Sequence, residues 1–299
     1  MKILVLKEEG IGNAIMVIPM LRALRYHLPL SEINVMGSNR NVELLRMVDC
    51  IDNVYSLDDD IPVHDICIDT VFSCHCLFER VKDRCKICVV AEGDYKTESE
   101  ARINLRCLNQ IGIVPRGEFY AELDRGGYRE NIICIHTGCF PGKGWNTRKW
   151  PIENWIDLIN RIPCDYDVYV LGGRPENKNG YVIQSGVSRA VANLTSLTKI
   201  EETADILRRA KCCVSIDSGI AHLSCAVGTP TIILYGPTSE IKSMPIVSEG
   251  RVQIIRVPME CQRCYILDKP RWKTCKTGAC MKAITPDKVH EALCKKLSQ

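Results

Sequence analysis

Residues 215–230 read SIDSGIAHLSCAVGTP and bring an aspartate, a serine, a glycine and a histidine close together in the chain. Apolar runs typical of buried strands lie on both sides, KCCV before and TIILYGP after. A short helix over 221–227 would put Asp217, Ser218 and Gly219 at a strand-to-helix turn. Helix N-termini present unpaired N–H groups and favour phosphate or diphosphate. The same residue types are also ordinary helix caps and turn formers, so this stretch alone does not distinguish an anion site from an ordinary turn.

Strand-like and helix-like segments alternate along the chain in two series. The first runs from KILVL, a glycine-bearing loop KEEGIGNA and the helix-like IMVIPMLRALRYHLP to the strand-like DICIDTVF. The polar stretch LDRGGYREN separates it from a second series, which runs from IICIHTG to TIILYG. Such alternation predicts parallel sheets with helices on both faces and a ligand site at the carboxyl ends of the strands. We expect an α/β protein with domains at 1–125 and 126–284 and a closing helix at 285–299.

Composition limits the class of protein. The chain is 46% hydrophobic and 25% charged, as soluble globular proteins are. A net charge of +3 without a long basic tract argues against a nucleic-acid partner. The first apolar run is too short for a signal peptide, and no stretch approaches a membrane span. We expect a cytoplasmic protein, with peripheral contact at the inner face of the membrane left open.

Eighteen cysteines are an unusual number for this chain. Many lie in strand-like runs, where a reduced cysteine acts as a small apolar residue. The exception is the C-terminal group Cys261, Cys264, Cys275 and Cys280. The first pair has the spacing of a metal knuckle, whereas the second pair is spaced more loosely than in common zinc ribbons. A structural zinc or iron site and free thiols that pack a loop are therefore open alternatives.

Several segments, taken in order, resemble glycosyltransferase family 9, which includes the ADP-heptose:lipopolysaccharide heptosyltransferases. They are GIGNAIMVIPMLRALR, IHTGCFPGKGWNTRKWPIENWIDLI, VLGGRPE, LTSLTKIEETADILRRA, VSIDSGIAHLSCAVGTPTIILYGPT and CMKAITPDKVHEAL. The resemblance implies the GT-B architecture, with two Rossmann-like domains facing across a cleft. It implies an inverting glycosyltransferase that moves a sugar. The expected sugar is a heptose, and the expected donor is ADP-heptose. The implied acceptor is a glycan or lipid-linked molecule such as lipopolysaccharide core, or a protein, and transfer requires no cofactor.

The resemblance also implies roles around the opening stretch. Ser218 and Gly219 would bind the donor diphosphate through a hydroxyl and backbone N–H groups. Asp217 would accept hydrogen bonds from sugar hydroxyls, and His222 would support the diphosphate end of the site. Such fixed donors stabilise the negative charge that grows on a leaving diphosphate in the transition state.

Further donor-side residues follow from the other motifs. Arg148, with Lys149 as its neighbour, would neutralise phosphate charge, and Glu176 would hold the ribose hydroxyls. Taken alone, these residues are better explained as ordinary surface charges, but the ordered set of motifs favours the binding roles. The predicted donor-binding set also includes residues at the ends of apolar strands or in the first glycine loop: Gly12, Thr137 and Gly173.

One position departs from the family's pattern. The usual candidate for the general base is an aspartate immediately after the second glycine of the N-terminal loop, and this chain has Asn13 there. An amide does not accept a proton usefully near neutral pH. Of the nearest carboxylates, Glu8 and Glu9, we take Glu9 as the substitute, so the predicted catalytic residues are Asn13, Glu9 and Arg148. The departure also favours an alternative, a catalytically impaired nucleotide-sugar binding protein.

The sequence does not favour two other classes of site. A nicotinamide-dependent oxidoreductase would need G-x-G-x-x-G after the first strand, and the chain lacks it there. The acidic stretch LDDDIP has the Asp-x-Asp pattern of a metal-dependent glycosyltransferase fold but lies away from the donor motifs. We interpret it as a solvated turn, so nothing in the sequence demands a divalent metal for transfer.

Overall fold

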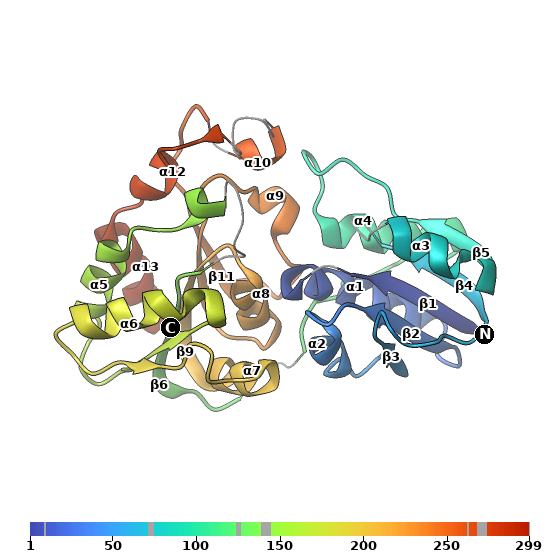
Figure 1. The fold of residues 1–299 in the computed structure, drawn as a ribbon, viewed down its shortest axis with the longest axis horizontal. Coiled ribbons are helices and arrows are strands. Elements are labelled where there is room, and N and C mark those ends of the chain that lie inside the picture. The colour runs from blue at the N-terminus through green and yellow to red at the C-terminus, as the bar shows by residue number, and fades with distance from the viewer. Residues whose placement is uncertain are drawn as a thin grey trace. The chain divides into compact units, whose positions relative to one another are not determined.

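The computed structural model describes residues 1–8, 10–70, 75–123, 127–138, 145–261, 263–267 and 274–298. The chain forms two compact units, Met1–Leu123 with Ile241–Val247 and Asp124–Glu240 with Ser248–Gln299. Each unit has its own sheet of parallel strands with helices, which confirms the predicted α/β class (Figure 1). The predicted domain boundary between residues 125 and 126 falls outside the described residues.

The first unit is built on a five-stranded sheet with the order β3-β2-β1-β4-β5, in which all neighbours are parallel. Its elements are β1 (Lys2–Lys7), α1 (Ile11–His27), β2 (Glu32–Gly37), α2 (Val42–Arg46), β3 (Asn53–Tyr55), β4 (His64–Asp69), α3 (His75–Val81), η1 (Lys82–Arg84), β5 (Cys85–Val90), α4 (Glu100–Cys107) and η2 (Leu108–Ile111).

The central position of β1 explains its nearly continuous apolar run. Leu4 and Leu6 pack in a cluster with Leu77 and Val81 of α3, and Ile3 and Val5 are equally buried. A strand covered on both faces needs apolar residues at every position rather than alternation. Helices α1 and α4 pack against each other. Their N-terminal turns follow the carboxyl ends of β1 and β5 in the chain, which is where α/β folds carry their sites.

The second unit has a six-stranded sheet with the order β11-β10-β9-β6-β7-β8, again with parallel neighbours. Its elements are β6 (Glu130–His136), η3 (Trp145–Arg148), α5 (Ile152–Asn160), β7 (Asp167–Leu171), η4 (Arg174–Glu176), α6 (Asn177–Gly186), β8 (Ala192–Asn193), α7 (Ile200–Arg209), β9 (Ala210–Ile216), α8 (Gly219–Ala226), β10 (Thr231–Leu234), α9 (Glu240–Ser243, which runs into the first unit), β11 (Val252–Ile255), α10 (Cys264–Leu267), α12 (Ala279–Lys282) and α13 (Pro286–Leu297).

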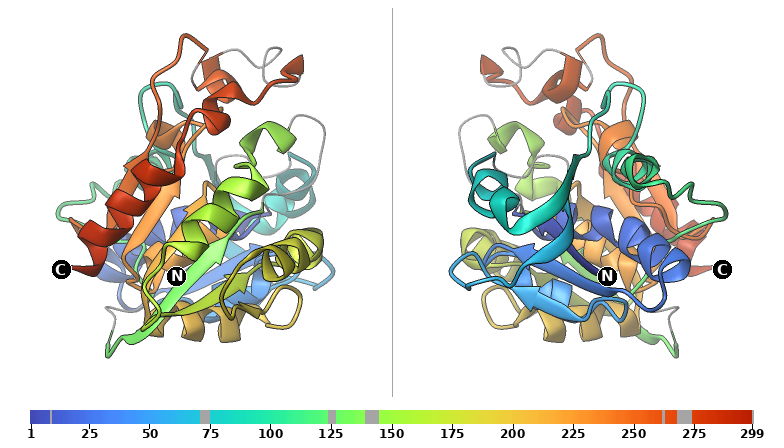
Figure 2. Two further views of the ribbon diagram at one scale, coloured as in Figure 1. Left: turned by 90° about the vertical axis from the view of Figure 1, so that its left-hand side faces the viewer. Right: turned by 90° about the vertical axis from the view of Figure 1, so that its right-hand side faces the viewer.

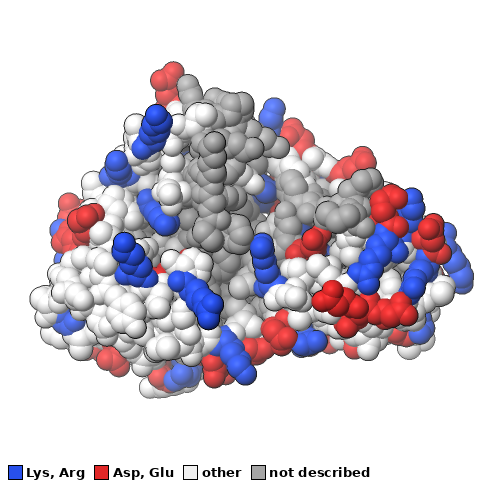
Figure 3. Space-filling model, viewed as in Figure 1, with Lys and Arg blue, Asp and Glu red and all other residues white. Residues whose placement is uncertain are grey.

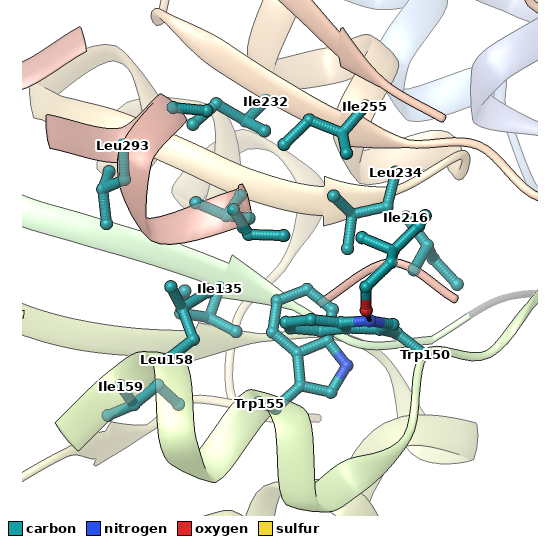
Figure 4. Packing of buried hydrophobic residues seen from close by; sticks show 14 of the residues in the cluster. Ile135, Trp150, Trp155, Leu158, Ile159, Ile216, Ile232, Leu234, Ile255 and Leu293 are labelled. Carbon is teal, nitrogen blue, oxygen red and sulfur yellow. Dashed lines mark hydrogen bonds between the residues drawn. The ribbon is translucent and has the colours of Figure 1, made fainter. Parts of the chain in front are cut away.

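Helices cover this second sheet, with α13 packed beside α5 and α7 beside α8 (Figure 2). Trp155 of α5 and Trp150, just before that helix, belong to the hydrophobic core of this unit (Figure 4). The rings of Trp150 and Trp155 meet edge to face with centroids 4.8 Å apart, and Trp150 Nε1 donates to the carbonyl of Ile284 at 2.8 Å. This packing holds the segment that precedes α5, and therefore Arg148, against the sheet.

Strand β5 is absent from the sequence-based expectation. It lies at the edge of the first sheet and reads CKICVV, with Ile87 52% exposed. An edge strand is half solvated and needs no continuous apolar run, so hydrophobic pattern alone does not mark it.

No helix among the described residues is long and apolar enough to cross a membrane. On the face of the first unit drawn in Figure 3, acidic and basic side chains are interspersed rather than gathered by sign.

Candidate functional site

The predicted strand-to-helix turn is present between β9 and α8. Ser218 is the N-cap of α8, and its Oγ accepts from the Ala221 N–H at 3.3 Å and contacts Ser215 Oγ at 3.1 Å. Ser215 is fully buried at the end of β9. The hydroxyl of Ser218 therefore has a fixed position, and the first turn of α8 presents its N–H groups at the carboxyl end of the strand.

Asp217 carries the charge of this turn and is held by two side chains. Arg148 Nη2 lies 3.1 Å from Asp217 Oδ2 and also donates to the Asp217 carbonyl, while His222 Nε2 lies 3.4 Å from Oδ1. Burial works to raise the pKa of Asp217, but Arg148, His222 and the Thr238 hydroxyl together hold that pKa well below its usual range. The carboxylate is therefore ionised and oriented at neutral pH.

His222 adds a buried polar atom to this cluster. Its side chain is 6% exposed, and its Nδ1 has no hydrogen-bond partner among the residues that the structure describes. A buried ring nitrogen without a partner is costly unless a ligand or water satisfies it. The cluster therefore has the character of a polar binding site.

Glu176 is held at the end of the neighbouring strand β7 by close contact with glycines. Its Oε2 accepts from the Gly173 N–H at 2.8 Å, and its side chain is buried. A Cβ at Gly138 would lie 1.9 Å from Glu176 Cγ, and one at Gly172 would lie 2.7 Å from Glu176 Cβ. Only glycine at these positions leaves room for the carboxylate.

The end of β6 contributes Thr137 and a neutral histidine. Thr137 Oγ1 accepts from Asn179 Nδ2 at 3.3 Å. Burial lowers the pKa of His136, whose Nδ1 donates to the Leu171 carbonyl at 2.9 Å. Strands β9, β6 and β7 are consecutive in the sheet, so their carboxyl ends bring Thr137, Glu176 and Asp217 to one edge of the second unit.

Most of the predicted donor-binding residues are gathered by this edge, and two are not. Lys149 is exposed, and its backbone N–H caps the short helix η3 by donating to Asn146. Gly12 belongs to the first turn of α1, in the other unit, together with Asn13. Glu9 lies outside the described residues.

A second polar cluster lies around Asn13 in the first unit. Asn13 Nδ2 donates to Oε1 and Oε2 of Glu100, at 3.3 and 3.1 Å. Lys7 Nζ lies 2.7 Å from Glu100 Oε1, and the two side chains are 0% and 3% exposed. Sequence reasoning missed this pair because its members are 93 residues apart. The available signals are weak: a lysine that ends an apolar strand, and a Ser-Glu pair that begins a helix.

The four C-terminal cysteines do not assemble into a metal centre. Burial and then the neighbouring Cys280, Cys261 and Cys275 raise the pKa of the Cys264 thiol to about 11, so the thiols lie near one another. Over the described ranges, no group of three or more His, Cys, Asp or Glu side chains is placed to hold a metal ion. This arrangement does not fit the predicted zinc or iron, and we derive no step through a metal.

Comparison with known proteins finds heptosyltransferases. A family model described as Glycosyltransferase family 9 (heptosyltransferase) matches residues 122–270. Lipopolysaccharide heptosyltransferase 1 of Pseudomonas aeruginosa is 33% identical over 101 residues, which cover 33% of this chain and 28% of that protein. Lipooligosaccharide heptosyltransferase 2 of Campylobacter jejuni is 26% identical over 161 residues, which cover 52% of this chain and 48% of the relative. Both matches span less than half of the relatives' lengths.

Solved structures match over the whole chain. The E. coli ADP-heptose lipopolysaccharide heptosyltransferase II has a TM-score of 0.79 at 18% identity, covering 100% of this chain and 99% of that one. The E. coli heptosyltransferase WaaC with ADP has a TM-score of 0.74 at 16% identity, covering 99% and 100%. The iron-containing dodecameric glycosyltransferase TibC has a TM-score of 0.63 at 15% identity, covering 99% and 75%. At these identities the likeness concerns the fold, and it confirms the GT-B architecture.

Proposed function

Because the chain belongs to glycosyltransferase family 9, we propose that it is an inverting glycosyltransferase that moves a heptose from ADP-heptose to lipopolysaccharide core. Other glycan or lipid-linked acceptors, and a protein, remain alternatives within the same chemistry. One observation carries the proposal: Arg148 and His222 meet at the buried carboxylate of Asp217, directly before the N-terminus of α8. Such a site offers fixed positive charge and N–H donors that suit a diphosphate, beside a carboxylate that accepts hydrogen bonds from hydroxyls.

In the proposed mechanism, the second unit binds the donor and stabilises its leaving group. The N–H groups of the first turn of α8 and the hydroxyl of Ser218 face the diphosphate. A guanidinium carries five N–H donors, so Arg148 can serve both Asp217 and a phosphate oxygen. As the bond to the anomeric carbon breaks, charge on the diphosphate increases, and these donors lower the barrier without having to move. Transfer on these terms needs no resident metal or cofactor.

Residues near the carboxyl ends of β6 and β7 supply further proposed contacts to the donor. Glu176 is the group that we propose to hold the ribose hydroxyls, since a carboxylate accepts hydrogen bonds from two hydroxyls at once. Asp217 would accept hydrogen bonds from hydroxyls of the sugar. The Nδ1 of His222, which lacks a hydrogen-bond partner within the described part of the chain, would contact the diphosphate end. A lipid-linked acceptor would bring the enzyme to the inner face of the membrane, where cytoplasmic nucleotide sugars are also available.

The alternative is a protein that binds the nucleotide sugar without transferring it, and Asn13 favours it. The test begins with thermal unfolding in excess ADP, UDP, GDP or NAD. A ligand at 100 times its Kd adds about 2.7 kcal/mol of stability, which shifts the midpoint by a few degrees. We expect a shift with ADP and none of that size with NAD. ADP release from ADP-heptose in the presence of heptose-free lipopolysaccharide then distinguishes an enzyme from a binding protein.

Substitution of Arg148 shows whether the response belongs to this site. Arg148→Ala should abolish the ADP-dependent shift and lower kcat/KM for transfer by about 100-fold or more. The matched control is Arg116→Ala, an exposed arginine of the first unit, which should behave as the wild type. Binding of ADP by Arg148→Ala with unchanged affinity would contradict the proposed donor site.

A further inference from the structure

The first unit holds a buried carboxylate directly beside the position where the family's pattern has an aspartate. Glu100, the first residue of α4, is 2% exposed. Asn13, in the first turn of α1, is half-buried and donates through Nδ2 to both carboxylate oxygens. The acid that is missing from α1 is therefore present on α4, within hydrogen-bonding distance of the same place.

The identity of residue 13 and that of residue 100 depend on each other. An ionised carboxylate only accepts hydrogen bonds, so it suits the amide of Asn13 and the ammonium of Lys7, which approach it at 3.1 and 2.7 Å. An aspartate at position 13 would put a second carboxylate against Glu100. Two carboxylates that share one site cannot both ionise without a large cost. The amide on α1 is thus what allows a buried acid on α4.

Lys7 explains how the acid is kept in place. The Lys7 side chain is fully buried at the end of β1, and its ammonium contacts one carboxylate oxygen of Glu100. Asn13, which is half-buried, contacts both oxygens. The carboxylate is therefore held from two directions, with its orientation set before any acceptor arrives.

We propose that Glu100 is the general base of the transfer reaction, an inference that rests on the proposed function. The proton of the acceptor hydroxyl passes to the Glu100 carboxylate, and the hydroxyl oxygen forms a bond to the anomeric carbon of the heptose. The bond from that carbon to the diphosphate oxygen breaks, and its electron pair leaves with ADP. Lys7 and Asn13 are positioning residues that orient the carboxylate.

The test compares two nucleophiles on the variant Glu100→Gln, with ADP release from ADP-heptose as the readout. Heptose-free lipopolysaccharide presents a hydroxyl that must lose a proton, whereas azide is an anion with no proton to lose. We expect transfer to lipopolysaccharide to fall by about 100-fold to 10,000-fold, and azide-dependent release to stay within about threefold of the wild type. Glu92→Gln, an exposed acid in the loop before α4, is the matched control and should change neither reaction.

A second variant guards against misfolding of the first. Asn13→Asp/Glu100→Gln exchanges the acid and the amide, so one carboxylate, one amide and the ammonium of Lys7 still meet. We expect this exchange to recover at least about tenfold of the transfer lost in Glu100→Gln, because it returns a base to the site. Asn13→Asp alone should give no increase in transfer over the wild type, since it crowds two carboxylates together.

The possible results distinguish a failure of the proposal for Glu100 from a failure of the proposed function. Equal losses of the lipopolysaccharide and azide reactions in Glu100→Gln would show that Glu100 only supports the structure, and full transfer by that variant would also overturn the proposal. No recovery in the exchange variant, if it binds ADP normally, counts against it as well. A wild type that binds ADP but releases none from ADP-heptose with either nucleophile would instead refute the proposed function, and the role of Glu100 with it.

Discussion

The two units each hold a buried carboxylate beside a cation, but they assemble it differently. In the second unit, Asp217 meets His222 from the same strand-turn-helix segment and Arg148 from 69 residues away. In the first unit, Glu100 meets Lys7 across 93 residues and Asn13 across 87. A site whose parts are neighbours in the chain leaves a sequence pattern, and one assembled from distant elements does not.

The two clusters also differ in how exposed the partners of the carboxylate are. Asp217 has partners that are 13% and 6% exposed, whereas Lys7 is completely buried behind Glu100. In the proposed function, the charge in the second unit serves a bound diphosphate. In the first unit the Lys7 ammonium instead orients Glu100, and Asn13 is the half-buried member of that cluster.

The largest effect that we expect comes from removing the buried cation of the first unit. Lys7→Met leaves Glu100 buried without its ammonium, and breaking a buried pair in this way costs about 3–5 kcal/mol. Urea unfolding measures the loss. The exposed pair Arg46–Glu43 of the same unit is the control, since Arg46→Met should cost less than about 1 kcal/mol. Similar losses for both variants would mean that the two pairs do not differ as the structure indicates.

A smaller effect is expected when the pH is lowered far enough to protonate Asp217 of the second unit. The folded pKa of Asp217 lies below its unfolded value of about 3.9, so its contribution is complete above that pH and is lost as pH falls toward the folded pKa. For an aspartate held this way the contribution is on the order of 2 kcal/mol. The free energy of unfolding of Asp217→Asn should therefore fall less steeply below pH 4 than that of the wild type. Parallel curves for the two proteins would show that Asp217 is not held as described.

The smallest effect is a change of space rather than of charge. Gly138→Ala would place a methyl group 1.9 Å from Glu176 Cγ and push the carboxylate out of its position. We expect ADP affinity to fall by about tenfold, or about 1.4 kcal/mol, measured by titration calorimetry. Gly127→Ala is the control, because nothing lies within 4 Å of the added Cβ. Unchanged affinity in Gly138→Ala would remove Glu176 from the proposed ribose contacts.

Much of the fold follows from pattern in the sequence. The two series of apolar strands and helices predict two parallel α/β units, and the interior strands β1, β6 and β9 are buried on both faces as their runs indicate. The edge strands β5 and β11 are missing from that expectation. A strand at an edge is partly solvated, so it carries a mixed sequence that hydrophobic pattern does not separate from a loop.

The sequence by itself determined the turn between β9 and α8, because Asp217, Ser218, Gly219 and His222 lie within one strand-to-helix connection whose geometry is local. It also showed that position 13 lacks an acid. Only the tertiary structure decided where an acid lies instead, because Glu100 reaches Asn13 through the packing of α4 against α1 and meets Lys7 at the end of β1. Periodicity and spacing describe neighbours along the chain. Contacts between distant elements depend on how those elements pack, which a single sequence does not record.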